Sequence, residues 1–106
     1  MILQSPFFIL IPYKIMFKKT KHIAFNKELW ISNRERRFTM INYILEHQLT
    51  IGFDKKEIIA LLGFEFNDIH SNIWTYYIGH KYFFSRKRKL YIYFNNLGKV
   101  YKLLKK

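Results

Sequence analysis

The chain lacks several features that would point to particular classes of protein. It has 106 residues, no cysteine, two prolines and four glycines. Without cysteine it can form no disulfide, no zinc–thiolate site and no thiol-linked lipid anchor. Its uncharged N-terminal run, residues 1–13, is too short to span a bilayer as a helix, and Pro6 and Pro12 interrupt it. Stability must therefore come from one packed core.

Aromatic residues are abundant instead. Eleven Phe, eight Tyr and two Trp make up 20% of the sequence. Such a content favours a packed sheet and argues against intrinsic disorder, because each ring buries a large apolar area. The length fits a single domain.

The net charge of +12 is concentrated towards the C-terminal end. Residues 81–106 contain nine basic residues and no acidic one. A basic tail is typical of proteins that meet nucleic acid or an anionic membrane. The alternative is compositional, because lysine outnumbers arginine 14 to 5 and Ile, Phe, Tyr and Asn are abundant, as an AT-rich genome would encode. Arginine is the better signature of phosphate recognition, so the sequence leaves both interpretations open.

The clearest local pattern lies at residues 54–62, which we predict to be a helix. Asp54 and Glu57 have the spacing of a capping box, in which each side chain accepts a hydrogen bond from the other residue's amide. Gly63 stands where a glycine with positive φ ends a helix at least cost. Gly52 lies in the short link before this helix. We therefore assign structural roles to Asp54, Glu57, Gly63 and Gly52.

A longer helix is predicted over residues 33–48. Ser32 and Glu35 have the spacing of a second capping box. The apolar side chains that follow are spaced as one face of a helix with 3.6 residues per turn; they are Met40, Ile41, Ile44 and Leu45.

The C-terminal third reads as β-strands. We predict strands at 74–79, 89–94 and 99–104; within 89–94, Leu90, Ile92 and Phe94 alternate with tyrosines. Residues 80–85 either extend the first strand or begin a hairpin that turns at 85–88. Residues 95–98 (NNLG) have the composition of a hairpin turn. The expected fold class is α+β, with two helices packed on one face of a three- to four-stranded antiparallel sheet in the order ααβββ.

The N-terminal segment, residues 1–20, does not fit this unit and is set apart from a domain at 30–106. We interpret it as non-native or poorly ordered sequence ahead of a true start at Met16, as a degenerate export signal, or as an extra edge strand. The protein would be cytoplasmic by default, and would belong to the cell envelope if the segment is an export signal.

A series of short motifs in a fixed order runs through residues 30–102. They are Arg37 and Met40, then Leu49-x-x-Gly52, Asp54-x-x-x-Ile58-x-x-x-Leu62-Gly63, Tyr77-Ile78-Gly79, Leu90-x-Ile92-x-Phe94 and Gly98-Lys99-Val100. In this order they resemble the small SmpA/OmlA (BamE-type) domains of bacteria, which share their fold with the β-lactamase-inhibitor-protein repeat.

The resemblance implies a protein-binding module, used for assembly in one case and for enzyme inhibition in the other. Two departures stand out. Glu65 occupies a position where the family often has proline, and the N-terminal cysteine of the lipoprotein members is absent. The second departure argues against an outer-membrane role. Fold alone does not fix function, so the function that this likeness suggests is an analogy.

Two groups of residues are candidates for contact with a partner. If Leu90, Ile92 and Phe94 face the helices, tyrosines of the strands face outward, and they form an aromatic surface typical of protein interfaces. The alternative is that tyrosine is simply a good strand residue. These tyrosines are Tyr77, Tyr91, Tyr93 and Tyr101. The second group is the basic run Arg86, Lys87, Arg88 and Lys89, which suits phosphates or merely keeps a hairpin soluble.

No catalytic or metal-binding pattern is found. The four histidines, His22, His47, His70 and His80, have no spacing that pairs two of them on one helix turn. We therefore expect no enzyme activity and no cofactor. The predicted function is a non-catalytic protein-interaction module that presents an aromatic sheet face to a protein partner. The alternative is a small basic protein that binds nucleic acid through its C-terminal hairpins.

Overall fold

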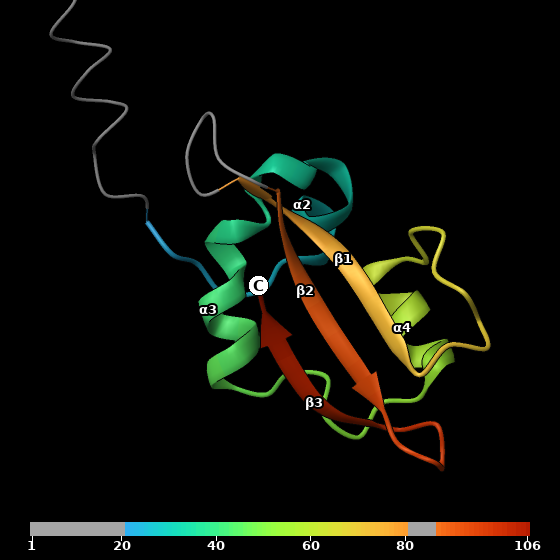
Figure 1. Ribbon diagram of the computed structural model, residues 1–106. Coiled ribbons are helices and arrows are strands. Elements are labelled where there is room, and N and C mark those ends of the chain that lie inside the picture. The colour runs from blue at the N-terminus through green and yellow to red at the C-terminus, as the bar shows by residue number, and fades with distance from the viewer. Residues whose placement is uncertain (1–20, 81–86) are drawn as a thin grey trace, which may run out of the picture.

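The computed structural model describes residues 21–80 and 87–106. Within these ranges, three short helices and a 3-10 turn precede three strands (Figure 1). The helical elements are α2 (Lys27–Ser32), η1 (Arg34–Arg36), α3 (Phe38–Glu46) and α4 (Lys55–Leu62), and the strands are β1 (Ile73–His80), β2 (Lys87–Phe94) and β3 (Val100–Lys105). The α+β class predicted from the sequence is confirmed.

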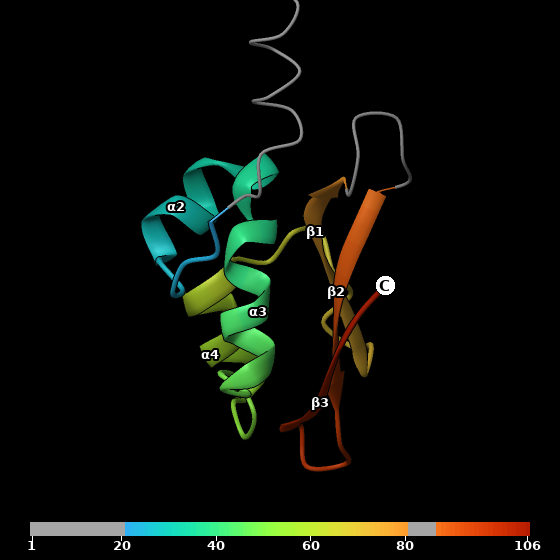
Figure 2. The same ribbon diagram turned by 90° about the vertical axis from the view of Figure 1, so that its left-hand side faces the viewer.

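The three described strands form one antiparallel sheet in the order β1-β2-β3. All the labelled helices lie on one side of this sheet, and its opposite side carries no helix or strand of the described chain (Figure 2). The predicted two-layer arrangement is therefore present. It leaves the sheet with one face in the core and one face turned to solvent.

The core lies between the two layers. Alternate residues of β1 and β2 point into it, as the alternating pattern of β2 predicted: Trp74, Tyr76, Ile78, Leu90, Ile92 and Phe94. The helices contribute Trp30, Met40, Ile41, Ile44, Ile58 and Leu62. Trp74 is held between the rings of Phe64 and Phe94, at centroid distances of 5.5 and 5.1 Å.

Helix α4 begins and ends where its sequence predicts. The Asp54 side chain accepts a hydrogen bond from the Glu57 amide at 2.9 Å, and Glu57 accepts one from the Asp54 amide at 2.8 Å. Gly63 follows with φ +85° and ψ 178°. Its φ is positive as predicted, but its ψ is extended rather than left-handed helical. This combination is essentially restricted to glycine.

The helix predicted over residues 33–48 is present in its main part as α3, but its first turn is the separate 3-10 element η1 and it ends at Glu46. The predicted N-cap at Ser32 is wrong. Ser32 is the last residue of α2, so it is not the N-cap of a following helix. The N-cap of α2 is Asn26, whose side chain accepts a hydrogen bond from the amide of Leu29 at 2.8 Å. Asn33 then leaves the helical conformation, with φ −137° and ψ 86°.

Tertiary packing explains this break. Trp30 of α2 is fully buried, and the guanidinium of Arg37 lies 4.5 Å from the centre of its ring. A continuous helix could not bring these two side chains together, because residues seven apart lie two turns from each other along the axis. Gly79 lets η1 approach the sheet: a Cβ there would lie 3.3 Å from the carbonyl oxygen of Glu35. Packing thus outweighs the local capping signal.

The first hairpin is described only in part. Residues 81–86 lie outside the described chain, and the possible strand extension over 80–85 and the site residue Arg86 fall largely there. The turn expected at 85–88 is wrong for its last two residues. Lys87 and Arg88 belong to β2 and pair with His80 and Gly79. The second hairpin turns at 95–98 as predicted, with Gly98 at φ +75°.

Candidate functional site

The exposed face of the sheet carries two of the predicted tyrosines at its centre. Tyr91 lies between Thr75 of β1 and Leu104 of β3, and Tyr93 lies between Ile73 and Lys102. Both rings are partly exposed, and neither is part of the core. We call this surface the outer face; it consists of Ile73, Thr75, Tyr91, Tyr93, Tyr101, Lys102 and Leu104.

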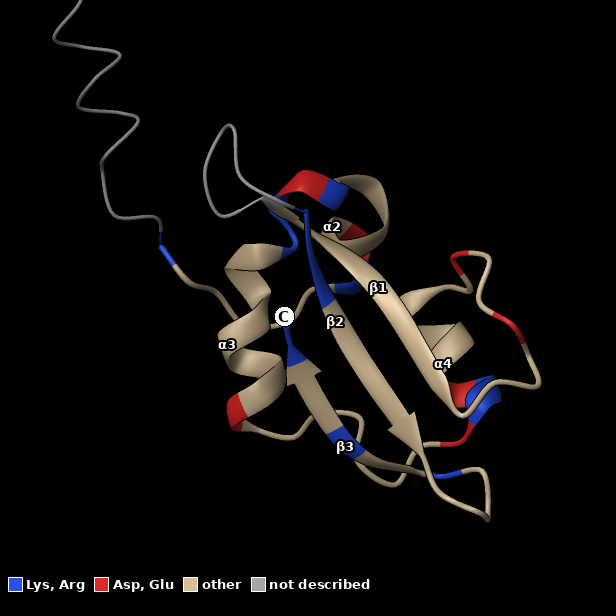
Figure 3. Cartoon of the chain, viewed as in Figure 1, with Lys and Arg blue, Asp and Glu red and all other residues tan. Residues whose placement is uncertain are grey.

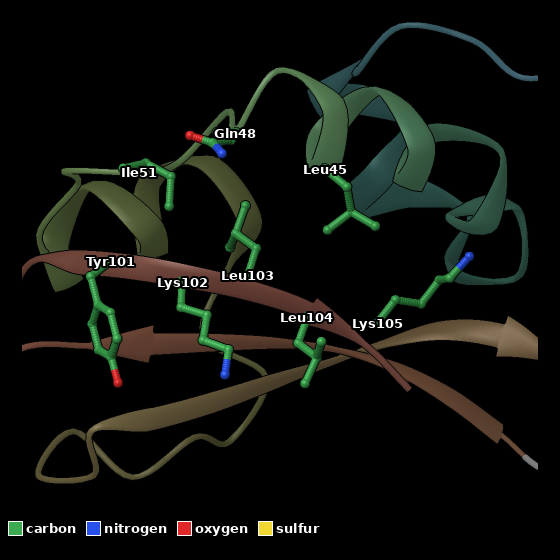
Figure 4. A pocket seen from close by; sticks show the side chains of 8 residues that line it. All are labelled: Leu45, Gln48, Ile51, Tyr101, Lys102, Leu103, Leu104 and Lys105. Carbon is green, nitrogen blue, oxygen red and sulfur yellow. The ribbon is translucent and has the colours of Figure 1, made fainter.

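A β-bulge adds a third tyrosine to the outer face. The register of β3 shifts between the pairs Tyr93–Lys102 and Phe94–Val100, so Tyr101 is an extra residue. The side chains of Tyr101, Lys102 and Leu104 consequently point to the same side, away from the helices (Figure 4). Tyr101 is 56% exposed, and its ring meets that of Tyr93 edge-on at 6.4 Å. The sequence did not predict this bulge.

Two lysine side chains lie over tyrosine rings of the outer face. The Nζ atom of Lys102 lies 5.1 Å from the ring centre of Tyr93, and that of Lys106 lies 4.8 Å from the ring centre of Tyr91. These distances are within the range of cation–π attraction. The outer face is therefore a mosaic of aromatic rings and positive charges.

Tyr77 lies in β1 as predicted, but its hydroxyl binds a residue of η1. Its hydroxyl donates to the Glu35 carboxylate, with O–O distances of 2.8 and 2.7 Å, and Arg34 lies 5.0 Å from its ring centre. Burial, and next the hydrogen bond to Glu35, raise the pKa of Tyr77 to about 12. Tyr77 thus ties β1 to η1.

The basic run does not form one cluster. Lys87, Arg88 and Lys89 lie on consecutive positions of β2, so their side chains alternate between the two faces. Arg88 is half-buried and lines a small cavity of about 90 Å³ together with Asn42 of α3, whereas Lys87 and Lys89 are exposed. Only these two lysines of the described run point to solvent.

The outer edge of β1 is closed by side chains. The Thr75 amide donates to Asn67 Oδ1 at 3.0 Å, and Asn67 Nδ2 donates to the Thr75 carbonyl at 3.1 Å. Ser71 Oγ pairs in the same way with both backbone groups of Ile73, at 3.1 and 2.9 Å. Each side chain thereby takes the place that a neighbouring strand would occupy.

An ion pair closes the same edge at Tyr77. The Tyr77 amide donates to Glu65 Oε2, and Arg37 Nη1 donates to the Tyr77 carbonyl, both at 3.1 Å. Arg37 also donates to Glu65 Oε1, and its Nε donates to the Trp30 carbonyl at 2.8 Å. Only 4% of the Arg37 side chain is exposed. We call Arg37, Glu65, Asn67 and Ser71 the β1-edge cluster.

Sequence reasoning missed this cluster. Arg37 was noted only as part of a motif, and Glu65 only as a departure from a family pattern. No local pattern indicates the cluster, because the bonds of Asn67 and Glu65 to β1 join residues 8 and 12 apart in the chain. Glu65 and Phe66 both have positive φ, at 55° and 59°, which aims the loop at the strand.

A second tyrosine connects the sheet to α4. The buried Tyr76 donates its hydroxyl proton to the Gly63 carbonyl at 2.6 Å. Burial, and next the charge of Glu65, raise the pKa of Tyr76 well above its usual value. Its hydroxyl is therefore a structural donor.

No reactive constellation emerges from the residues that can be placed. Within residues 21–80 and 87–106, no three His, Cys, Asp or Glu side chains converge as metal ligands. No helix in those same ranges has the length and apolar character needed to cross a membrane. Comparison with protein-family models, curated proteins and solved structures found no match to this chain.

Proposed function

We propose that this domain is a non-catalytic protein-binding module whose contact surface is the outer face of the sheet. The observation that carries the proposal is the group of Tyr91, Tyr93 and Tyr101 on β2 and β3, on the side of the sheet opposite the described helices. Tyrosines on rigid strands offer large contact areas at small entropic cost and have hydroxyls for hydrogen bonds, which suits interface hot spots.

The neighbouring residues support a protein partner. Ile73 at the rim is 47% exposed, and Leu104 between the tyrosines and the edge is partly exposed. A face that combines aliphatic, aromatic and basic groups is typical of protein interfaces, which are rich in tyrosine and apolar at their centre. The resemblance to BamE-type domains, which serve as protein-binding modules, points the same way.

Nucleic acid fits the same surface less well. Single strands bind by stacking their bases on exposed ring faces. Here Lys102 and Lys106 lie over the rings of Tyr93 and Tyr91 and would have to move before a base could stack. The lysines themselves would favour phosphate, so nucleic acid remains the second candidate.

The test is a double substitution on the outer face. Tyr91→Thr with Tyr93→Thr keeps β-propensity and removes the aromatic area, so the protein should fold and lose its partner. Retention would be measured by affinity capture from the native cell extract with the full chain as bait, followed by quantitative mass spectrometry. Tyr43→Gln is the control, because Tyr43 lies on α3 and stacks on His47 at 4.0 Å. Equal capture by all three proteins would refute the proposal.

A further inference from the structure

The two edges of the sheet are treated differently by the fold. At β1, side chains satisfy the backbone groups of Ile73, Thr75 and Tyr77, which closes that edge to a further strand. At β3, described residues close the position at Val100: the Gly52 amide donates to the Val100 carbonyl at 2.8 Å, and the Val100 amide donates to the Phe53 carbonyl at 2.9 Å.

Beyond Val100, the edge of β3 is open along Leu103. Lys89 and Lys106 exchange two hydrogen bonds, of 2.9 and 3.0 Å. Because inward and outward backbone groups alternate along an antiparallel strand, Leu104 turns towards β2 and Leu103 turns towards the free edge. Among the described residues, no group pairs with the amide or the carbonyl of Leu103. An unpaired edge of this kind is a template for another strand.

A pocket lies beside this open edge. It has a volume of about 550 Å³ and is bounded by the edge of β3 on one side and by Leu45, Gln48 and Ile51 on the other (Figure 4). Leu103 points from the strand towards Leu45 and Ile51. Every second side chain of an added strand would therefore contact apolar residues of the pocket.

The positive charge around the pocket favours an acidic partner. Lys102 and Lys105 line it, and no acidic residue does. Blue segments, which mark Lys and Arg, recur along β3 and at the start of β2 (Figure 3). A second copy of this chain would place its own lysines against these, so like charges would oppose pairing between copies. An acidic strand would instead meet opposite charges across the ladder.

We propose that the free edge of β3 binds an extended acidic segment of a partner protein as a fourth strand. Backbone hydrogen bonds to Leu103 would give affinity, as in known cases of strand addition. Apolar side chains of the segment would face Leu45 and Ile51, and its acidic side chains would lie on the outer face beside Lys102. The preferred sequence thus alternates apolar and acidic residues. The proposal adds a binding edge that shares Lys102 with the outer face, and it stands even if the tyrosines bind nothing.

The first experiment titrates the full-length protein with a synthetic peptide, acetyl-Glu-Val-Glu-Val-Glu-amide. Saturable binding should slow hydrogen exchange of the Leu103 amide, read by NMR. Two control peptides should fail: the analogue with lysine in place of glutamate, because it repels Lys102, and the analogue N-methylated on the valines, because it cannot form the ladder. Three outcomes would overturn the proposal: equal binding of the lysine peptide, amide shifts confined to β1, or a Leu103 amide already protected without peptide.

Variants of the protein provide the second experiment. Leu103→Pro removes the edge amide, and Leu103→Ala trims the same side chain but keeps that amide. Losing one hydrogen bond should weaken peptide binding about tenfold in the proline variant relative to the alanine variant. Equal affinities of the two variants would argue against strand addition.

A further pair of variants does not depend on the proline variant folding. Ile51→Glu places a carboxylate in the pocket wall and should weaken the acidic peptide. Ile59→Glu is the matched control on α4, since Ile51 and Ile59 are 38% and 37% exposed. Tyr91→Thr with Tyr93→Thr should leave peptide binding unchanged, which separates failure of this proposal from failure of the proposed function. Unchanged binding by Ile51→Glu would contradict the pocket assignment.

Discussion

At the scale of single residues, Arg37 joins several elements of the described chain. It lies over Trp30, bonds to the Trp30 carbonyl, and bridges Glu65 to the backbone of Tyr77. A buried cation costs free energy unless its donors are paired, and here the pairing joins the α2–α3 region, the loop before β1 and β1 itself. Its removal would leave the half-buried Glu65 carboxylate without its main partner.

We therefore predict that Arg37→Met lowers the free energy of unfolding by about 3 kcal/mol, the usual effect of breaking a buried pair. Arg34→Met is the matched control. Arg34 also faces Glu65, at 3.6 Å, but 57% of its side chain is exposed, and an exposed pair of this kind contributes no more than about 1 kcal/mol. Urea denaturation followed by tryptophan fluorescence measures both. Similar losses for the two variants would show that Arg37 is not the key cation.

At the scale of secondary-structure elements, the β1 edge is protected by side chains that imitate a strand. Asn67 uses both ends of its amide on Thr75, as the backbone of a neighbouring strand would. Natural sheets commonly block their edges to prevent unwanted pairing. The open edge at β3 contrasts with this protection within the same sheet.

Asn67→Ala should accordingly have two effects. It should lower stability by about 1 kcal/mol for the lost hydrogen bonds, and it should promote self-association, because the Thr75 backbone becomes available to a second molecule. Asn72→Ala is the control, since Asn72 is exposed and contributes its backbone carbonyl rather than its side chain. Sedimentation velocity over a concentration series measures the association. A strictly monomeric Asn67→Ala protein would rule out the blocking role.

The secondary-structure elements differ in how well the sequence predicts them. Helix α4 was predicted with its caps, because Asp54, Glu57 and Gly63 act through bonds to near neighbours in the chain. The strands were predicted because alternation of apolar residues reflects burial on one face. The helix boundaries around Ser32 were wrong, because the burial of Trp30 beneath Arg37 is a tertiary effect.

The candidate site was predictable to a similar degree. Alternation placed Tyr91 and Tyr93 on the outer face, and the structure has them there. The bulge that adds Tyr101 and Lys102 to one side has no local signal in the sequence, since it depends on the pairing of two strands. The β1-edge cluster likewise depends on how a loop folds back onto a strand.

At the scale of the whole molecule, four of the described lysines lie on the outer side of the sheet. Lys87 and Lys89 are exposed at one end of β2, Lys102 and Lys106 lie over tyrosines, and Arg88 points to the helix side. Lys89 of β2 and Lys106 directly after β3 are hydrogen-bonded neighbours, so positive charge surrounds the tyrosines of the outer face. A positive surface of this kind raises the rate of encounter with any acidic partner.

This distribution gives a test that separates the two classes of partner. In Lys87→Gln with Lys89→Gln, affinity for a protein bound at the outer face should change little, with the main effect on the association rate. For a single-stranded oligonucleotide, the slope of log affinity against log salt should instead become shallower by roughly two, one for each lysine lost. Surface plasmon resonance over a salt series measures both. A strong salt-dependent loss of the captured protein partner would contradict binding through the tyrosines.

The pairing of Val100 with Gly52 and Phe53 has a consequence for how the domain is completed during synthesis. These backbone groups, which immediately precede α4, obtain their partners only from the last described strand. The helical layer can form early, but the link before α4 stays without this anchor until β3 has left the ribosome and paired with β2. Strand β3 thus closes the domain, and a nascent chain that stalls before Val100 would hold α4 by its caps and core contacts alone.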